Sequence, residues 1–313
     1  MKQRIILAGG SGFLGKALAQ KFVARGDEVI VLTRSPQIRA DGAKEILWDA
    51  KSLGDWTKWI DGADAIINLA GKSVDCRYTK KNQRELIRSR VDPTRILGEA
   101  IARAKNPPRV WLNSSSATIY KHSFDKPMDE SGETGATLEA KDEFSIEIIR
   151  QWENALDNAQ TPDTRKVAMR ISLVFGRDGG VFPVFRRLAK FGLAGALAGG
   201  RQMFSWIHEE DFCRAVGWIL ANEDLSGAIN ISAPNPVSNR EAMRLVRRAC
   251  GVPFGLPAAE WMLEIGAFFL RTETELLIKS RYVVPGKLPA SGFKFQFPEL
   301  RGALADICKS SRA

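Results

Sequence analysis

The chain begins with a short apolar run that leads directly into a glycine-rich turn. Residues 5–8 are aliphatic, and Gly9, Gly12 and Gly15 follow in the pattern GxxGxxG. Where a strand, such a turn and a helix N-terminus meet, unpaired backbone N–H groups and the positive end of the helix dipole converge and bind pyrophosphate. The pattern alone also fits a plain tight turn, so the residues after it decide between the two.

Those residues complete a strand–helix–strand unit. Apolar pairs at 17–18 and 22–23 have helical spacing, and an Arg-Gly-Asp sequence at 25–27 separates them from an apolar strand at 28–33. This unit favours a dinucleotide site over a plain turn. An acidic residue after the second strand would bind the ribose 2′-hydroxyl of NAD, whereas a cation suits the 2′-phosphate of NADP. The residue there is Arg34, which predicts NADP(H).

Strands and helices alternate over the first part of the chain. Further strands are expected at 65–71, 109–113 and 166–175, and helices at 82–105, interrupted or restarted near Pro93, and at 143–158. This order predicts an α/β fold with a doubly wound parallel sheet of the Rossmann type. Residues 1–176, completed by 207–232, form the expected NADP-binding domain.

The remaining residues, 177–206 and 233–313, are expected to form a smaller C-terminal substrate lobe. The segment 179–200 is rich in glycine and mobile in character. Ser238 and Glu241 have the spacing of a capping box and predict a helix that runs toward Cys250.

Composition excludes several classes of protein. The 313 residues are 26% charged and 44% hydrophobic, as in an ordinary globular protein. The four cysteines form no CxxC pair and only two histidines could join them, so we expect reduced thiols and no metal site. No leader precedes the first strand, and no uncharged apolar run approaches the ~18 residues of a membrane span. We therefore expect a cytoplasmic protein with no membrane partner.

The net charge of +10 is concentrated in one segment. Residues 72–109 hold eleven basic and four acidic residues, a surplus of seven. Part of this segment follows a strand end, where an anionic small molecule would lie, but a solvated helix face explains most of it equally well. Arg90 lies among the regularly spaced apolar residues Leu86, Ile87 and Val91, so its side chain is expected to point inward. Few aromatic residues interleave with the basic ones, so we expect no nucleic-acid partner.

The motifs resemble those of the extended short-chain dehydrogenase/reductase superfamily over nearly the whole length. The matching pieces are GGSGFLG at 9–15, NLAG at 68–71, SSSATIY at 114–120, the segment 170–176 and WIHEED at 206–211. The sequence GGRQ before SWIHEEDF, and GKLP, GFKF and ALADI in the tail, are similar to the atypical epimerase-family branch. That branch is NAD-dependent epimerase/dehydratase-like, has a characteristic C-terminal domain and includes members labelled cell-division inhibitors.

The resemblance implies catalytic residues, but one of the usual elements is missing. Superfamily members use a Ser or Thr with a Tyr-x-x-x-Lys pair for proton transfer. None of the three tyrosines here has lysine four residues later. Ser116 matches the superfamily's serine, and Tyr120 could act with it, helped by Lys121 or His208. Alternatively, Tyr120 packs in the core and Ser116 bonds the backbone or the cofactor.

The resemblance also implies binding residues. Cofactor contacts are expected from Gly9, Ser11, Gly12, Phe13, Leu14 and Gly15 at the pyrophosphate, Arg34 at the 2′-phosphate, Leu69 and Ala70 beside the adenosine, Glu85 and Arg90 above the cofactor, and Phe175 near the nicotinamide. Substrate contacts are expected from Phe185, Arg201 and Trp206, because an arginine beside aromatics suits an anionic, nucleotide-sugar-like molecule. These three residues could equally well only close the second lobe.

Two functions remain open at this point. One is an NADP-dependent oxidoreductase or epimerase-like enzyme that acts on a small anionic substrate. The other is a non-catalytic NADP(H)-binding regulatory protein, which the missing Tyr-x-x-x-Lys pair favours. A homodimer or a protein partner is compatible with either function.

Overall fold

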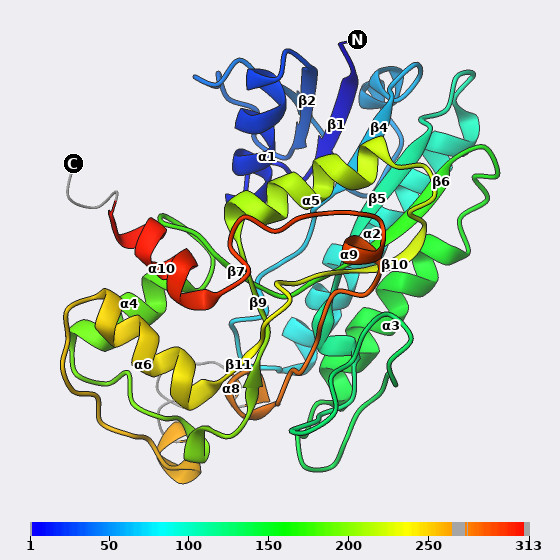
Figure 1. The fold of residues 1–313 in the computed structure, drawn as a ribbon. Coiled ribbons are helices and arrows are strands. Elements are labelled where there is room, and N and C mark those ends of the chain that lie inside the picture. The colour runs from blue at the N-terminus through cyan, green and yellow to red at the C-terminus, as the bar shows by residue number, and fades with distance from the viewer. Residues whose placement is uncertain (1, 265–272, 274, 310–313) are drawn as a thin grey trace.

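A seven-stranded parallel sheet forms the centre of the larger lobe (Figure 1). The computed structural model describes residues 2–264, 273 and 275–309. The strands are β1 (Arg4–Ala8), β2 (Glu28–Thr33), β3 (Lys44–Leu47), β4 (Ala65–Asn68), β5 (Val110–Ser116), β6 (Arg165–Ile171) and β10 (Gly227–Ile231). Their order is β3-β2-β1-β4-β5-β6-β10, and all six pairings are parallel. The order reverses at β1, so a crevice is expected at its carboxyl end.

Helices cover both faces of this sheet. Alternate residues of β1 point to opposite faces, as the pleat requires. Leu7 shares a buried cluster with residues of α1 (Phe13–Ala24) and α5 (Glu209–Ala221), and Ile6 shares another with residues of α2 (Lys80–Arg103) and α3 (Glu143–Asp157). The predicted α/β, doubly wound fold is therefore confirmed.

The helix α2 continues through Pro93, contrary to the expected interruption. Proline in a helix interior costs about 3 kcal/mol, because one backbone hydrogen bond is lost. The helix buries Leu86 before Pro93 and Ile96, Leu97 and Ile101 after it. Each such side chain contributes about 1.5–3 kcal/mol when buried, so packing against the sheet outweighs the proline.

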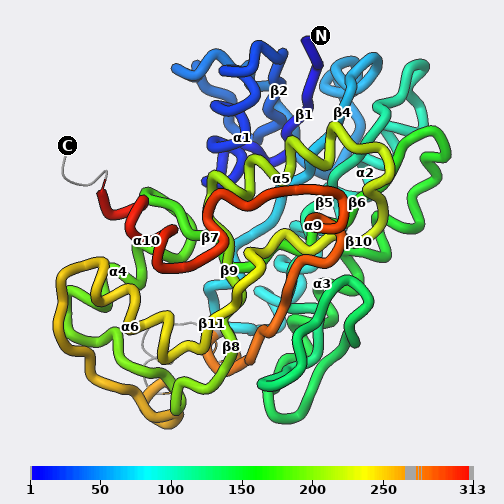
Figure 2. The backbone as a smooth tube through the Cα atoms, viewed as in Figure 1, coloured from blue at the N-terminus to red at the C-terminus, as the bar shows by residue number. Residues whose placement is uncertain are grey.

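The second lobe surrounds a buried aromatic cluster. Its elements are β7 (Leu173–Phe175), α4 (Phe182–Lys190), β8 (Met203–Phe204), β9 (Trp206–His208), β11 (Val237–Ser238), α6 (Asn239–Ala249), α8 (Glu275–Ile278) and α10 (Leu300–Lys309). The helix α9 (Lys287–Ala290) packs on β10 of the larger lobe. The short 3-10 helices are η1 (Asp55–Trp59), η2 (Ala117–Ile119) and η3 (Ala198–Gly200). Figure 2 shows the chain after α8 running back along the larger lobe to α9 and then returning to α10. The C-terminal segment thus joins the two lobes.

Three local expectations differ from the structure. The strand expected at 166–175 divides at Ser172, because Leu173 onward pairs with β9 instead of extending the main sheet. The glycine-rich segment 179–200 contains the helix α4. The strand β3 was not expected. Parts of the predicted C-terminal lobe, 265–272, 274 and 310–313, lie outside the described residues.

The helix predicted from the capping box is present as α6. Ser238 is its N-cap, and its side chain accepts a hydrogen bond of 3.3 Å from the Glu241 N–H. No helix in the part of the chain that the structure describes has both the length and the apolar character needed to cross a bilayer.

Candidate functional site

The glycine turn lies between β1 and α1, at the point where the strand order reverses. Gly9 has a φ of +71°, and a Cβ there would lie 2.7 Å from the Ala70 Cα atom. A Cβ at Gly15 would lie 2.3 Å from the Gly10 Cα atom. Both positions therefore require glycine, one for the approach of the next strand's end and one for close packing of the helix.

Gly12 differs, because the space beside it is open. Among the described residues, no heavy atom lies within 4 Å of the position that its Cβ would take, apart from Gly12 itself and its two chain neighbours. Gly12 is the N-cap of α1, with extended backbone and no side-chain cap on the first turn. Backbone N–H groups and the helix dipole consequently face an accessible space beside the exposed Ser11. These features fit a pyrophosphate group.

The next two residues of the turn close the site on the second-lobe side. Phe13 packs against a glycine-rich loop at 176–180, where a Cβ on Gly176 would lie 2.3 Å from its ring. Leu14 is half-buried beside the apolar cluster of the α1 face. The expected contacts of Phe13 and Leu14 with a cofactor stay predictions.

Arg34 lies directly after β2, the neighbour of β1. Its side chain is exposed, and among the described residues none forms a hydrogen bond or ion pair with its guanidinium. The Arg34 guanidinium can therefore bind a phosphate without breaking an existing contact. The geometry therefore fits a nucleotide with a 2′-phosphate.

The residues expected around the adenosine and above the cofactor lie near the end of β4. Leu69 and Ala70 are half-buried at the turn after the strand. Glu85 accepts a hydrogen bond of 2.6 Å from Lys72 Nζ. Arg90 points inward as predicted: it donates to the Lys72 carbonyl oxygen at 2.9 Å and stacks over Trp152, and burial lowers its pKa to about 10. Arg90 thus holds the loop after β4.

Three expected contact residues lie in the aromatic core instead. The rings of Phe175 and Phe185 have centroids 6.0 Å apart, and the fully buried Trp206 packs edge-on to Phe175 and donates from Nε1 to the Asn235 carbonyl oxygen at 3.1 Å. Their side chains stabilise the second lobe, which for Phe185 and Trp206 was the alternative that the sequence left open. A contact of Phe175 with the cofactor stays a prediction. Of the expected substrate residues, Arg201 is the one with an exposed side chain, and its guanidinium lies 5.2 Å from the Phe124 ring centre.

Ser116 and Tyr120 differ in their environments. Ser116 is half-buried at the end of β5, and its Oγ accepts a hydrogen bond of 3.2 Å from the Thr118 N–H. Tyr120 is fully buried; its hydroxyl donates to Asn230 Oδ1 at 2.8 Å and accepts from Arg170 Nη1 at 2.9 Å. Burial raises the pKa of Tyr120. The structure thus gives Tyr120 a packing role and leaves the Ser116 hydroxyl hydrogen available for a ligand.

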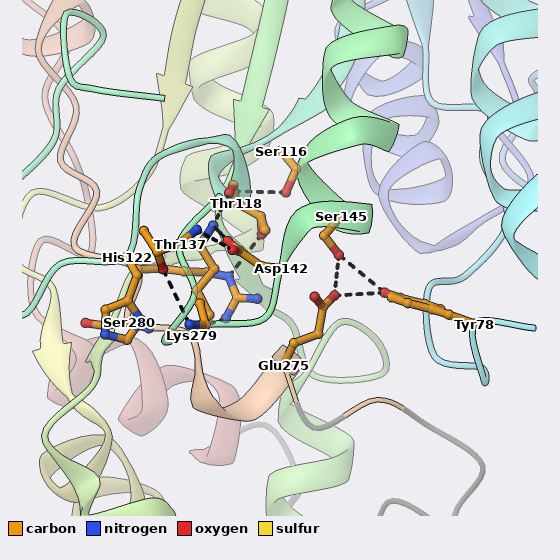
Figure 3. A network of polar contacts seen from close by, with 12 residues as sticks. Tyr78, Ser116, Thr118, His122, Thr137, Asp142, Ser145, Glu275, Lys279 and Ser280 are labelled. Atoms are coloured by element: carbon orange, nitrogen blue, oxygen red, sulfur yellow. Dashed lines mark hydrogen bonds and ion pairs between the residues drawn. The ribbon is translucent and has the colours of Figure 1, made fainter. Parts of the chain in front are cut away.

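A polar network beside Ser116 was not predicted (Figure 3). Lys279 is buried, pairs with the buried carboxylate of Asp142 and donates to the Thr118 carbonyl oxygen at 2.6 Å. Burial lowers the pKa of Lys279 to about 8. The C-terminal segment therefore anchors on η2 and on the start of α3. The only sequence signal was a lysine in the apolar run after Glu275.

A second part of this network surrounds Glu275. Its Oε1 accepts hydrogen bonds from Ser145 Oγ and, at 3.2 Å, from the Tyr78 hydroxyl (Figure 3). Burial raises the pKa values of both Glu275 and Tyr78. Ser145 lies in the first turn of α3. A carboxyl group between two hydroxyls can hold and pass on a proton.

The two expected helpers have other contacts. Lys121 forms an ion pair with Glu133 at 2.8 Å. His208 is buried as the N-cap of α5: its Nδ1 accepts a hydrogen bond of 3.0 Å from the Glu210 N–H, and its ring stacks on Phe297. Both are structural contacts.

The buried His208 should make stability depend on pH. Burial lowers its pKa, so the folded state binds fewer protons than the unfolded state once the pH falls below about 6.5. Stability should then fall with pH, by up to about 1.4 kcal/mol for each unit of the shift. Asparagine also caps helices but does not titrate. In urea unfolding at about pH 7.5 and about pH 5.5, His208→Asn should lose less stability than the wild type; equal losses would contradict this role.

Comparison with known proteins defines the class of this chain. The model of the NAD dependent epimerase/dehydratase family matches residues 5–232, and that of a domain of unknown function, DUF1731, matches residues 258–307. The chain belongs to the NAD dependent epimerase/dehydratase family. The resemblance seen in the sequence is thereby confirmed.

Individual relatives extend over nearly the whole chain. Epimerase family protein SDR39U1 of Bos taurus is 32% identical over 310 residues, 97% of this chain and 99% of that protein. The crystal structure of human SDR39U1 with NADPH is 30% identical, has a TM-score of 0.85 and covers 98% of this chain and 99% of its own. A nucleoside-diphosphate sugar epimerase from Corynebacterium glutamicum is 27% identical, has a TM-score of 0.77 and covers 98% of this chain and 58% of its own.

Proposed function

We propose that this chain is an NADP(H)-dependent oxidoreductase or epimerase-like enzyme that acts on a small anionic substrate. The observation that carries the proposal is the open turn at Gly12 after β1, together with the exposed Arg34 after the neighbouring strand β2. The NADPH in the structure of human SDR39U1 supports the same cofactor. NADP(H) supplies hydride chemistry when bound. The residues of this chain bind it, orient the substrate and supply protons.

Two features of the larger lobe bind the phosphate groups of NADP(H). The N–H groups of the first turn of α1 bind the pyrophosphate, because no side chain in the described part of the chain fills the space beside Gly12. Arg34 binds the 2′-phosphate through a charge-assisted hydrogen bond. This division predicts a preference for NADP(H) over NAD(H).

The polar network around Ser116 and Glu275 handles the protons of the reaction. Ser116 donates a hydrogen bond from Oγ to the substrate oxygen, because the one hydrogen bond that this hydroxyl forms with the described residues is one that it accepts. Glu275, with Tyr78 and Ser145, holds the proton that the missing Tyr-x-x-x-Lys pair handles in other members. Its raised pKa favours the protonated form at higher pH than usual for a carboxylic acid.

The substrate class follows from charge. Arg201 is exposed beside Phe124 and can bind an anionic group next to a flat ring. The likeness to a nucleoside-diphosphate sugar epimerase, at 27% identity, supports a nucleotide-linked sugar.

The second candidate is an NADP(H)-binding protein without catalysis, whose occupancy regulates a protein partner. The missing Tyr-x-x-x-Lys pair and the burial of Tyr120 favour it. NADPH oxidation across a panel of carbonyl compounds and nucleotide sugars separates the two candidates. Turnover of any compound supports the enzyme, and binding of NADPH with no turnover supports the regulatory protein.

Replacement of Ser116 by alanine is the sharpest test of the chemistry. Loss of a positioned proton donor should lower kcat by about 100-fold or more. The NADPH Kd should change little, because the turn at Gly12 is intact. The matched control is Ser131→Ala, which removes an exposed hydroxyl bonded to Asp129. Equal kcat values for Ser116→Ala and the wild type would remove Ser116 from the mechanism.

Replacement of Glu275 by glutamine tests the proton store. Glutamine can keep hydrogen bonds to Tyr78 and Ser145 but does not titrate. The limb of the kcat profile that reports Glu275 should disappear, while the NADPH Kd stays within about twofold. An unchanged pH profile would restrict Glu275 to a structural role.

A further inference from the structure

Exposed apolar side chains gather at one end of the second lobe. Six of the eleven large apolar residues that are exposed in the described chain lie in two short segments: Phe191, Leu193, Phe254, Leu256, Trp261 and Met262. Phe191 is 73% exposed, Phe254 64% and Trp261 63%. We refer to these six residues as the apolar patch. Such a concentration marks an interaction surface more often than isolated exposed residues do.

The two segments lie side by side. The Leu256 N–H donates to the Gly192 carbonyl oxygen at 2.7 Å, and the Ala258 N–H donates to the Ala196 carbonyl oxygen at 3.0 Å. A Cβ on Gly192 would lie 2.9 Å from the Phe254 ring. Figure 1 shows α4 and the chain after α6 together at the end of the second lobe remote from β1 and β2. The patch therefore lies away from the nucleotide site.

Positive charge accompanies the apolar patch. Residues 179–208 include four basic residues and no acidic residue. Residues 241–264 include three basic residues, of which Arg244 pairs with Glu241, and three acidic residues. On α4, Arg187 is exposed and lies between the exposed Val184 and Phe191 at helical spacing, with the exposed Lys190 beside them. Arg247 donates to the Ala194 carbonyl oxygen between the two segments. Glu260 is the acidic residue next to Trp261.

This combination selects the kind of partner. A two-fold contact between copies of the patch would bring like charges together, which disfavours a second copy of this chain. Exposed aromatic residues next to lysine and arginine are typical of surfaces that enter the headgroup region of anionic bilayers. We propose that the apolar patch docks the second lobe on an anionic lipid surface. The expectation of no membrane partner rested on the lack of a span, which peripheral docking does not need.

Sedimentation with vesicles tests the aromatic part of the proposal. The full chain should sediment with vesicles of equal parts phosphatidylcholine and phosphatidylglycerol, and much less with phosphatidylcholine alone. The double variant Phe191→Ser, Phe254→Ser should bind about tenfold more weakly or worse, because two apolar anchors are lost. The matched control is Ile38→Ser, Leu138→Ser, which changes residues that are 103% and 85% exposed on the larger lobe and should leave binding unchanged.

A second pair of variants tests the charge. Arg187→Gln, Lys190→Gln should weaken binding to the anionic vesicles and reduce its sensitivity to salt. Lys51→Gln, Lys58→Gln, on the larger lobe, should do neither. Thermal unfolding of each variant verifies that it is folded. The proposal is overturned if anionic vesicles do not bind the wild type, or bind the Phe191→Ser, Phe254→Ser variant equally well. A wild-type dimer that this variant converts to monomers, without vesicle binding, would assign the patch to a second copy.

Discussion

Replacement of Arg170 by methionine should lower the free energy of unfolding by about 3–5 kcal/mol, because it leaves a buried carboxylate without its partner. Arg170 donates to Glu153 from Nε at 3.0 Å and from Nη2 at 2.9 Å, and both side chains are largely buried. It also donates to the Tyr120 hydroxyl. Methionine fills the volume but provides no donor for either group. Urea unfolding measures the loss.

The matched control for Arg170 is an exposed ion pair. Arg95 pairs with Glu99 at 2.8 Å on the surface of α2, one turn apart. Arg95→Met should change the free energy of unfolding by about 0.5 kcal/mol or less, since exposed pairs contribute little. The double variant Arg170→Met, Glu153→Leu should recover part of the loss, because it removes the unpaired charge. A loss below about 1 kcal/mol for Arg170→Met would contradict the buried network.

Replacement of Gly12 by aspartate should abolish NADPH binding without unfolding the protein. The backbone at Gly12 is extended, and its Cβ would enter open space, so aspartate fits without strain. Aspartate is a favourable N-cap, so stability should be equal or a few tenths of a kcal/mol higher. The carboxylate would occupy the space proposed for pyrophosphate, and like charges about 4 Å apart repel by about 4 kcal/mol near a protein surface. We expect NADPH affinity to fall by about 100-fold or more.

Gly302 provides the control for this substitution. It lies in the first turn of α10, and the space beside its Cβ position is also open. Gly302→Asp should leave both stability and NADPH affinity unchanged. If Gly12→Asp binds NADPH as tightly as the wild type does, the phosphate groups do not lie at this turn.

The features that were predictable from sequence are local ones. The turn at Gly9, the cation at Arg34 and the helix cap at Ser238 depend on neighbouring residues, so their patterns identify them without tertiary information. The inward direction of the Arg90 side chain was predictable from the spacing of the apolar residues around it. The interruption expected near Pro93 was wrong. Burial of α2 residues before and after Pro93 outweighs the local preference of proline against a helix interior.

The features that sequence could not predict depend on contacts between distant residues. Tyr120 is a core residue because Arg170 and Asn230, 50 and 110 residues away, bond its hydroxyl. Lys279 and Glu275 meet partners 137 and 130 residues earlier in the chain. The hydrophobic periodicity of a sequence is local and does not predict pairs of residues so far apart in the chain. Phe175, Phe185 and Trp206 were likewise predicted to contact ligands, whereas the structure buries their side chains in the aromatic cluster of the second lobe.

NADP(H) recognition by Arg34 is tested most directly by the affinities of the wild type and Arg34→Ala for NADPH and NADH, measured by nucleotide fluorescence. The wild type should bind NADPH more tightly than NADH. The substitution should weaken NADPH binding by about 1.5–3 kcal/mol, the range for a hydrogen bond to a charged group, and leave NADH binding unchanged. Equal affinities of the wild type for the two nucleotides would contradict binding of the 2′-phosphate by Arg34.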